Sequence, residues 1–383
     1  MDKIEEVLTR GVASVLPDKN SLAKLMAAKK IRVYLGIDPT GPRLHVGHTI
    51  PMRKLQAFAD LGHDTILVFG TGTVLAGDPS QRKEKRAEIT EEEVEKNIAD
   101  WKKQAEKIID FEKVKIVKNG DWLLKLTIPE LIRIESQLSA TQLFKRDMFQ
   151  ERLNRGDVVS YHETLYPVLQ GYDSVHLDVD LEIGGTDQTF NMLVGRELQK
   201  KINNREKFVL ATPLISGTDG QQMTKSTGNC IWLDDSPNDM YGKVMSVADS
   251  QLEEYWTNLT NFPSSELKDL KPLDAKKKLA FEIVKTFHGE AEAQKAQDDF
   301  QSTFQKGVAP QNLPEIKVQE PDVELVDFLA KNNLAASKSE AKRLLKEGAI
   351  EIDGRTITES EVKFENNQVM RIGKKKFVRI VIS

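Results

Sequence analysis

The chain has 383 residues, of which 39% are hydrophobic and 30% charged, a composition typical of globular proteins. This length exceeds one typical core, so two or three domains are expected, and no apolar run approaches the length that crosses a bilayer. The acidic start Met1-Asp-Lys-Ile-Glu-Glu is unlike a secretory signal, and a single cysteine excludes an internal disulfide framework; both favour a cytoplasmic location.

The charge is unevenly distributed along the chain. The formal net charge is −4, yet residues 323–383 carry twelve Lys/Arg against nine Asp/Glu, so a basic tail follows an acidic body. Such an asymmetry suggests an appended module that contacts RNA or DNA.

In the first part of the chain, the sequence predicts a helix, a strand, a turn and a second helix, in that order. Residues 1–30 are expected to be helical, and alternating apolar residues over 31–35 predict a short strand. Prolines and glycines at 39–42 predict a turn, and a helix is expected after His48. Because the first amides of a helix lack internal partners, a strand, a turn and a helix start together form a natural anion site.

Two histidines three residues apart, His45 and His48, would project to one side of a helical turn. They could bind zinc, but the single Cys230 is remote and no acidic residue completes a ligand set nearby. They could equally be one surface histidine and one core histidine. The local sequence leaves these interpretations open.

Further strands and helices then alternate. Strands are predicted over 65–69 and 114–117, and Thr90 with Glu93 forms a capping box at the start of the helix between them. This alternation predicts a parallel, doubly wound sheet whose ligand crevice lies beyond the carboxyl ends of its strands. The segments 34–48, 71–80 and 119–122 all follow strands, so we expect them to converge there. The glycine-rich loop over 70–80 lacks a P-loop ending and is a weak nucleotide signal alone.

The second half of the chain is predicted to be mainly helical. Residues 128–172 and 237–306 read as helices, while alternation predicts strands over 177–183 and 208–215. A polar loop spans 216–229. Residues 307–322 hold three of the fourteen prolines and little apolar periodicity, which is typical of a linker.

Several motifs in this order resemble one enzyme family. His45-Val-Gly-His48 resembles the His-Ile-Gly-His signature of class I aminoacyl-tRNA synthetases, and Gln222-Met-Thr-Lys-Ser226 resembles their Lys-Met-Ser-Lys-Ser loop. Gly-Gly-Thr-Asp-Gln over 184–188 lies between them, and residues 337–354 are similar to the S4-like RNA-binding domain. Within the class, the chain resembles the bacterial-type tyrosyl-tRNA synthetases over nearly its whole length.

The resemblance implies an α/β fold with a Rossmann-like doubly wound parallel sheet, followed by an all-helical domain and a small α+β S4-like domain. The implied domains are a catalytic domain over 1–222, with a helical dimerisation region at 128–172, and a loop plus helical anticodon-arm domain over 223–306. The linker at 307–322 and the S4-like domain over 323–383 follow. A homodimer without membrane contact is implied.

The activity implied by the resemblance is that of a tyrosine–tRNA ligase. It would activate L-tyrosine with ATP to tyrosyl-adenylate and pyrophosphate, and then transfer tyrosine to the 3′ end of tRNA(Tyr). Mg²⁺ would accompany ATP, which is a substrate, with no tightly bound cofactor and no metal held by the protein. The alternatives are tryptophanyl-tRNA synthetase, which does not usually carry the S4-like tail, and a non-catalytic RNA-binding synthetase-like protein.

The resemblance also assigns residues to roles. The catalytic set is Thr40, His45, His48, Arg82, Arg86 and Lys225. ATP would contact Gly36, Asp38, Gly47, Gly185, Asp187, Met223 and Lys225. Tyrosine would contact Tyr34, Asp78, Tyr166, Gln170, Asp173 and Gln188, with Tyr34 and Asp173 reading the phenol. RNA would contact Lys145, Arg146, Arg152, Lys338, Lys342, Arg343 and Lys346.

Four of these assignments carry an alternative. The basic segment 82–86 could be a solvated helix terminus, and the helix with Tyr166, Gln170 and Asp173 could simply have a polar outer face. Gln222 stands where the family usually has a lysine, so Lys225 would need help from Arg82 and Arg86, or the loop would act less strongly. The lysines at 338, 342 and 346 form one helical stripe suited to phosphates, but such a stripe can also be a solvated helix face.

Overall fold

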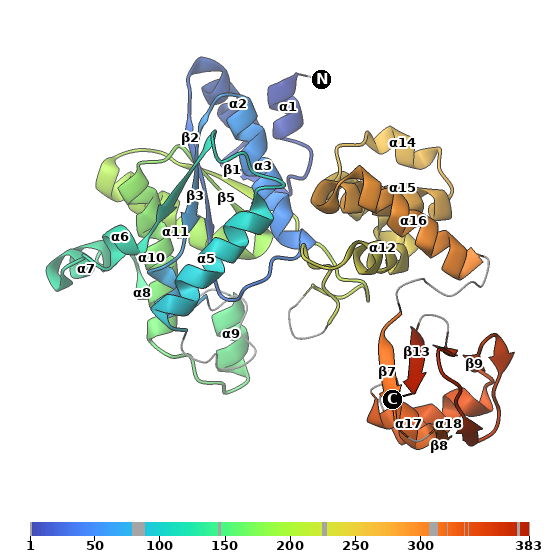
Figure 1. Cartoon of the computed structure of the whole chain (residues 1–383). Coiled ribbons are helices and arrows are strands. Elements are labelled where there is room, and N and C mark those ends of the chain that lie inside the picture. The colour runs from blue at the N-terminus through green and yellow to red at the C-terminus, as the bar shows by residue number, and fades with distance from the viewer. Residues whose placement is uncertain are drawn as a thin grey trace. The chain divides into compact units, whose positions relative to one another are not determined.

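The computed structural model of the chain describes residues 2–78, 89–144, 147–223, 228–305, 313–319, 321–332, 334–335, 337–373 and 376–382 (Figure 1). The chain divides into two compact units, Met1–Ala293 and Gln294–Ser383. Within the described residues, no helix is both long enough and apolar enough to span a bilayer.

The first unit is built around a six-stranded sheet in the order β1-β6-β5-β2-β3-β4. Neighbouring strands are parallel, except that β1 pairs antiparallel with β6. Three consecutive side chains of β2 are buried, as expected for a strand covered on both faces. The predicted doubly wound parallel sheet is therefore confirmed. Its strands are β1 Ser14–Leu16, β2 Arg32–Ile37, β3 Asp64–Phe69, β4 Val114–Lys118, β5 Leu181–Gly185 and β6 Phe208–Thr212.

Helices cover both faces of this sheet. Helix α3 (Thr49–Asp60) packs against β2, β3 and β5, whereas α10 (His162–Leu177) and α11 (Thr189–Asn203) pack together, with α11 against β5 and β6. Figure 1 shows α3 and α5 (Glu91–Ala105) on one side of the sheet and α10 and α11 on the other. The chain runs from β2 towards β4 in one direction and from β5 to β6 in the other. A ligand crevice is therefore expected between the carboxyl ends of β2 and β5.

The remaining helices of this unit are short or belong to the helical part that follows the sheet. In that part, Trp256, Tyr241 and Tyr255 are fully buried and form the centre of the packing. Helices before the sheet's last strand are α1 Lys3–Val7, α2 Lys19–Ala28, α4 Thr73–Ala76, α6 Gly120–Leu123, α7 Ile128–Glu135, α8 Ala140–Phe144 and α9 Asp147–Asn154. Those after it are α12 Pro237–Ser246, α13 Leu252–Leu259, α14 Ser264–Lys268 and α15 Pro272–His288, in the range predicted to be helical. Helix α16 (Glu290–Gln305), in the same predicted range, begins in this unit and continues into the second.

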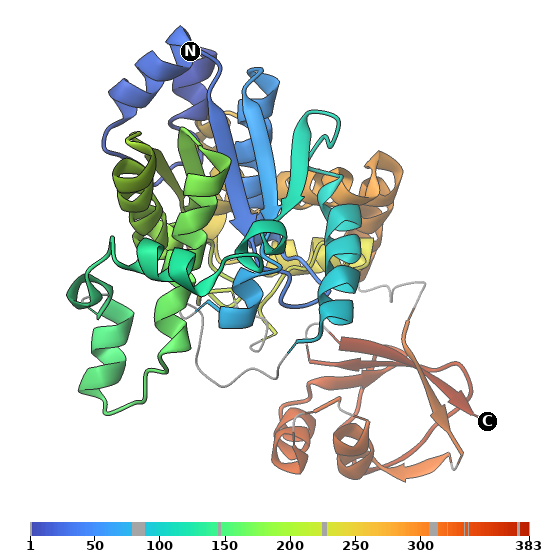
Figure 2. The ribbon, with the colours of Figure 1, turned by 90° about the vertical axis from the view of Figure 1, so that its left-hand side faces the viewer.

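The second unit is a small α+β domain with its own core. A five-stranded sheet has the order β10-β9-β12-β13-β7, and β11 pairs with β8. Leu325, Leu329, Ala341, Ile350 and Ile380 are among the buried residues that join these strands to two helices (Figure 2). The elements are β7 Glu315–Val318, β8 Asp322–Glu324, α17 Leu325–Lys331, α18 Lys338–Lys346, β9 Ile350–Ile352, β10 Arg355–Thr356, β11 Glu361–Lys363, β12 Val369–Ile372 and β13 Lys376–Ile382.

Four sequence predictions are wrong in detail. The helix expected over 1–30 is interrupted by β1, because the edge of β6 is open to pairing there. The strand expected from residue 177 begins at Leu181, since α10 continues to Leu177 and ends with Asp178 in the left-handed conformation (φ 50°). The strand expected to reach 215 ends at Thr212, before a proline. Within the predicted linker 307–322, residues 315–318 form β7, which pairs in parallel with β13.

Candidate active site

Polar loops meet at the carboxyl edge of the sheet, where the sequence predicts a crevice. Asp38 follows β2, and its carboxylate accepts hydrogen bonds from Thr73 Oγ1 (2.7 Å) and the Tyr166 hydroxyl (2.9 Å). Thr73 is the first residue of α4, shortly after β3, and Tyr166 lies on α10. A Cβ at Gly70 would lie 1.9 Å from Asp38 Oδ1, so only glycine fits this turn. Three segments remote in sequence are thus joined at one carboxylate.

The end of β5 is tied to the same edge. Gln188 Nε2, at the end of the 3₁₀ turn Thr186–Gln188, donates to Asp78 Oδ2 at 2.8 Å. A Cβ at Gly185 would approach Asp187 Oδ1 to 2.4 Å, so a side chain there would displace that carboxylate. The structure therefore brings Asp78, from one of the segments predicted to converge, next to Gln188 and the end of β5.

Asp173 is the most deeply buried acid among the predicted site residues. It is 3% exposed, and its carboxylate accepts hydrogen bonds from Trp122 Nε1 (2.8 Å) and Asn119 Nδ2 (3.0 Å). Burial raises the pKa of Asp173 to about 8, although both hydrogen bonds favour the ionised form. Because this pKa lies close to neutral pH, a small change in the surroundings of Asp173 would change its protonation state.

Tyr34 lies at the inner wall of the site. Its side chain is fully buried, and its hydroxyl lies 3.0 Å from Ser174 Oγ and 3.4 Å from the Gln170 carbonyl oxygen. Burial, with the nearby carboxylates of Glu182 and Asp173, raises the pKa of the Tyr34 phenol well above its usual value. The hydroxyl therefore stays protonated and can both donate and accept.

The rings of the two signature histidines are in close contact, with their planes tilted by 45°. Their ring centroids are 3.8 Å apart, and the His45 backbone N–H donates to His48 Nδ1 at 3.1 Å. His48 Nδ1 is thus an acceptor, so its second ring nitrogen carries the proton when the ring is neutral. A Cβ at Gly47 would lie 3.0 Å from His45 Nδ1. Among the described residues, no three His, Cys, Asp or Glu side chains come together as metal ligands.

The other predicted ATP contacts lie close to these loops along the chain. The Thr40 N–H donates to the Asp38 carbonyl at 2.8 Å, and Gly36 lies in β2 two residues before Asp38. Met223 is buried. The Gln222 carbonyl accepts from Asn229 Nδ2 at 3.0 Å, which anchors the start of the polar loop.

Several predicted residues lie outside the described part of the chain. They are Arg82, Arg86, Lys145, Arg146 and Lys225. The expected meeting of basic side chains at the phosphate end of the site therefore stays a prediction.

The remaining predicted RNA contacts are in two places. Arg152 is mostly buried and pairs with the buried Glu163 carboxylate, so its charge is already engaged. On α18, Lys338, Lys342 and Lys346 are exposed on one stripe, with Lys338 paired to Asp327 at 2.7 Å. Arg343, also exposed, pairs with Glu347 at 2.8 Å.

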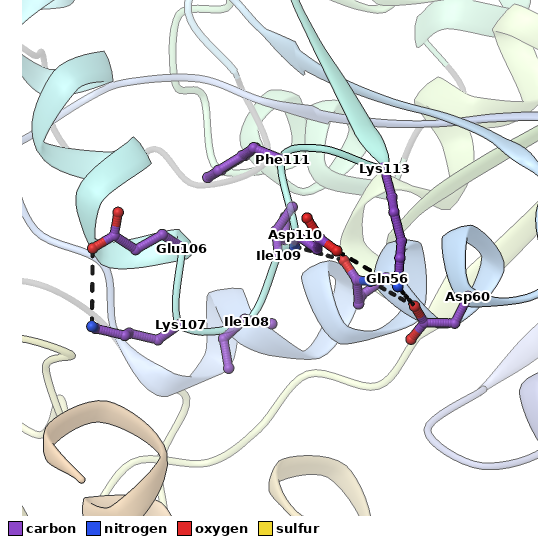
Figure 3. Close-up of a pocket in the computed structure, with 9 residues that line it drawn as sticks. All are labelled: Gln56, Asp60, Glu106, Lys107, Ile108, Ile109, Asp110, Phe111 and Lys113. Carbon is purple, nitrogen blue, oxygen red and sulfur yellow. Dashed lines mark hydrogen bonds and ion pairs between the residues drawn. The ribbon is translucent and has the colours of Figure 1, made fainter.

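One hollow in the first unit lies away from this site. It has a volume of about 580 Å³ and lies where the chain leads into the amino end of β4 (Figure 3). Its polar residues bond to one another, as Lys113 does to Asp60 at 2.8 Å. It lies at the opposite end of the strand from the converging loops and has no part in the site. Its lining residues are Gln56, Asp60, Glu106, Lys107, Ile108, Ile109, Asp110, Phe111 and Lys113.

Several residues that shape the site have no role assigned from sequence patterns. Asn119 and Trp122 were placed at the correct edge, but nothing in their types predicts that they hold Asp173. Ser174, Glu182 and Lys207 were missed. The one available signal was a charged Glu182 in the middle of an otherwise apolar buried strand.

Comparisons with known proteins agree with the geometry. The family model described as "tRNA synthetases class I (W and Y)" matches residues 26–305, and the "Tyrosine--tRNA ligase SYY-like C-terminal domain" matches residues 304–380. The tyrosine–tRNA ligase of Thermotoga maritima is 40% identical over 98% of this chain and 96% of that protein. Tyrosine–tRNA ligase 2 of Vibrio cholerae is 39% identical over 100% of both chains.

Solved structures also match. A C-terminally truncated mitochondrial tyrosyl-tRNA synthetase of Aspergillus nidulans gives a TM-score of 0.68 at 25% identity, covering 79% of this chain and 94% of that one. The tyrosyl-tRNA synthetase of Archaeoglobus fulgidus, complexed with L-tyrosine, gives 0.63 at 21% identity, covering 77% and 99%, a likeness of fold.

Proposed function

Since the chain belongs to the bacterial tyrosyl-tRNA synthetases, a branch of the class I tRNA synthetases, we propose that the converging loops bind tyrosine and ATP. The chain is a ligase that activates tyrosine with ATP and joins it to tRNA. Tryptophan as substrate and a purely RNA-binding role are not favoured, because the C-terminal match and the relatives described above are those of tyrosine–tRNA ligases. At the site itself, buried Asp173 near the Tyr34 phenol supports this function best.

In the first reaction, a tyrosine carboxylate oxygen forms a bond to the α-phosphorus of ATP, and the bond from that phosphorus to the bridging oxygen breaks. Pyrophosphate leaves with the electron pair. The carboxylate is already a nucleophile, so the site needs no general base. It must hold the two reactants in line and stabilise the charge that develops on the phosphates.

We assign the phosphate end to Thr40, His45 and the basic residues Arg82, Arg86 and Lys225. Gly47 and His48 would pack against the ribose and adenine, with Asp187 accepting from the ribose hydroxyls. The contact between the two histidine rings and the lack of room for a side chain at Gly47 support this placement, because glycine there allows a ligand to approach the backbone. The remaining proposed ATP contacts are Gly36, Asp38, Gly185 and Met223.

We assign the phenol of the substrate to Tyr34 and Asp173 and its ammonium group to Asp78, Tyr166 and Gln170. Gln188, bonded to Asp78, completes this set. A site built to bond a hydroxyl rejects phenylalanine because its own buried polar groups would lose a partner, a discrimination for which tyrosyl-tRNA synthetases are the usual example.

Mg²⁺ would arrive with the ATP phosphates, since hard cations of this size are commonly bound through substrate oxygens and water. We also place the enzyme in the cytoplasm, which suits a chain with one buried cysteine. Fractionation of cells that express the tagged chain would test this location.

The proposed domains are those inferred from the sequence: a catalytic domain over 1–222, a loop and helical anticodon-arm domain over 223–306, and an S4-like domain, here extended to include β7. The exposed lysine stripe of α18 supports tRNA binding by the last of these. Lys145, Arg146 and Arg152 remain candidates for the acceptor stem.

We propose a homodimer through the region 128–172. The observation in favour is a set of exposed apolar side chains at and beside α7, namely Leu124, Ile128 and Ile132. Next to them, α7, α10 and α11 line a hollow of about 460 Å³. Sedimentation equilibrium should give twice the chain mass for the wild type and the chain mass for Ile128→Glu/Ile132→Glu. A monomeric wild type would contradict this interface.

The function is tested by ATP–pyrophosphate exchange driven separately by tyrosine, tryptophan and phenylalanine. We expect exchange with tyrosine and little with the other two amino acids. Exchange driven by tryptophan, or no exchange with any of the three, would contradict the proposal.

A further inference from the structure

A buried ion pair lies directly behind the proposed tyrosine site. Lys207, just before β6, is 0% exposed, and Glu182, in β5, is 1% exposed, and their charged groups are in contact. A buried ion pair is weak evidence for stability, because the desolvation of both charges offsets their attraction. Its retention in this position therefore suggests a role in the geometry of the site.

The polar atoms of this pair reach two proposed tyrosine contacts. Glu182 Oε1 accepts from Gln170 Nε2 at 3.0 Å, and Glu182 Oε2 accepts from Ser174 Oγ at 3.3 Å. Lys207 Nζ donates to Ser174 Oγ at 2.8 Å, and the Tyr34 hydroxyl lies 3.0 Å from the same oxygen. The pair thus holds Gln170 directly and Tyr34 through Ser174.

The contact with Glu182 decides which way the Gln170 amide faces. A carboxylate can only accept, so it binds the amide nitrogen and turns Gln170 Oε1 away from itself. Gln170 Oε1 is buried and has no hydrogen-bond partner among the described residues. A buried acceptor without a partner is costly, and a substrate ammonium group would satisfy it.

The packing around Lys207 leaves space for the pair. A Cβ at Gly195 of α11 would lie 2.6 Å from Lys207 Nζ and 2.7 Å from Ser174 Oγ. Glycine at this position therefore leaves room for the Lys207 ammonium group beside Ser174 and Glu182, which it contacts.

We propose that Glu182 and Lys207 are positioning residues for tyrosine: Glu182, held in place by its contact with Lys207, orients the Gln170 amide so that Oε1 receives the substrate ammonium group. Neither residue touches the substrate. This inference depends on the proposed function, specifically on the assignment of Gln170 to the ammonium group.

The test replaces both charged side chains of the pair with neutral ones. In Glu182→Gln/Lys207→Met, a neutral amide of the same size faces Gln170, so either orientation of the Gln170 amide is allowed. Because one charge-assisted hydrogen bond is weakened, the KM for tyrosine in pyrophosphate exchange should rise about tenfold, with the KM for ATP unchanged. Adding Gln170→Glu to this variant should restore the KM to within about threefold of wild type, since a carboxylate accepts on both sides.

In the wild-type background, the same Gln170→Glu substitution should raise the KM for tyrosine, because it places a second carboxylate against Glu182. This single variant tests the inference even if the double variant does not fold, which thermal unfolding would reveal. Lys113→Met/Asp60→Asn, an exposed pair at the amino end of the sheet, serves as the control and should leave both KM values unchanged.

Each outcome decides between the inference and the proposed function. Suppose first that Gln170→Ala raises the KM for tyrosine. Three results would then overturn the inference alone: a double variant with the wild-type KM for tyrosine, a triple variant whose KM is no lower than that of the double, or an unchanged KM in Gln170→Glu alone. If Gln170→Ala changes nothing, the assignment of Gln170 is wrong and the inference is overturned with it.

Discussion

At the scale of single residues, the site depends on buried polar groups whose protonation is set by burial. Asp173 shows this most clearly, because its carboxylate accepts hydrogen bonds from Asn119 and Trp122 and still has a pKa of about 8. A group with a raised pKa in the folded state binds its proton more tightly there than in the unfolded chain. Its contribution to stability is present in full below about pH 4, the unfolded pKa, and is lost as the pH rises towards 8.

The direction of this pKa shift predicts that the stability difference between the wild type and Asp173→Asn depends on pH. Asparagine does not titrate, so the stability of the wild type relative to the variant should fall between pH 5 and pH 8, by up to about 1.4 kcal/mol per pH unit. Urea unfolding at pH 5, 6.5 and 8 measures this difference. Asp121→Asn, at an exposed position, should show no such trend. A difference that does not vary with pH would contradict the raised pKa of Asp173.

Sequence motifs indicate many of the proposed site residues, but not the residues that hold them in place. Motifs identify His45, His48 and Asp187 because their types and order are characteristic. Ser174, Glu182 and Lys207 belong to different elements and become neighbours only through packing of the sheet against α10. No local pattern contains such a relation, so it could not have been predicted from spacing alone.

At the scale of elements, one amide joins three of the converging segments. Asn119, just after β4, accepts from the Gly72 N–H at 2.8 Å and donates to Thr73 Oγ1 at 3.1 Å and to Asp173. The loop after β3, the start of α6 and the middle of α10 are therefore fixed to one another.

Periodicity predicted the strands, but the ends of β5 and β6 and the added strands β1 and β7 depend on which sheet edges are available for pairing.

Asn119→Ala should therefore affect stability and substrate binding together. Loss of a buried partner should lower the free energy of unfolding by about 1–3 kcal/mol, and a less constrained Asp173 should raise the KM for tyrosine about tenfold. Unfolding by urea and pyrophosphate exchange measure the two effects.

Thr90→Ala provides the matched control. It removes the capping box of α5, in which the Glu93 N–H donates to Thr90 Oγ1 at 3.2 Å, and should cost about 1 kcal/mol without changing the KM for tyrosine. If both variants raised the KM equally, the effect of Asn119 would come from general loss of stability and not from its contact with Asp173.

At the scale of the whole molecule, the proposed active site and the basic helix α18 belong to separate units. The sheet unit carries the converging loops, and the second unit has its own buried core and an exposed basic helix. The uneven charge of the sequence predicted this division of roles. The sequence placed the start of the second unit too late, because β7 is joined to its sheet through pairing with the distant β13.

Replacement of Lys338, Lys342 and Lys346 by alanine should weaken tRNA binding and leave tyrosine-driven exchange unchanged. If each lysine contacts one phosphate, the slope of log affinity against log salt should fall by about three. Filter binding between 50 and 200 mM salt, roughly the range in which such slopes are resolved, measures this change. Lys317→Ala on β7 is the control for a single exposed lysine, and an unchanged slope in the triple variant would contradict phosphate contact by α18.

We propose that buried Asp173 recognises the phenol of tyrosine at the carboxyl edge of the sheet. Calorimetric titration of Asp173→Ala with tyrosine, phenylalanine and ATP tests it most directly, with a cooperative unfolding transition as the check on folding. We expect tyrosine affinity to fall by at least about tenfold, the preference over phenylalanine to disappear, and ATP affinity to stay unchanged. Wild-type affinity for tyrosine in this variant would contradict the account.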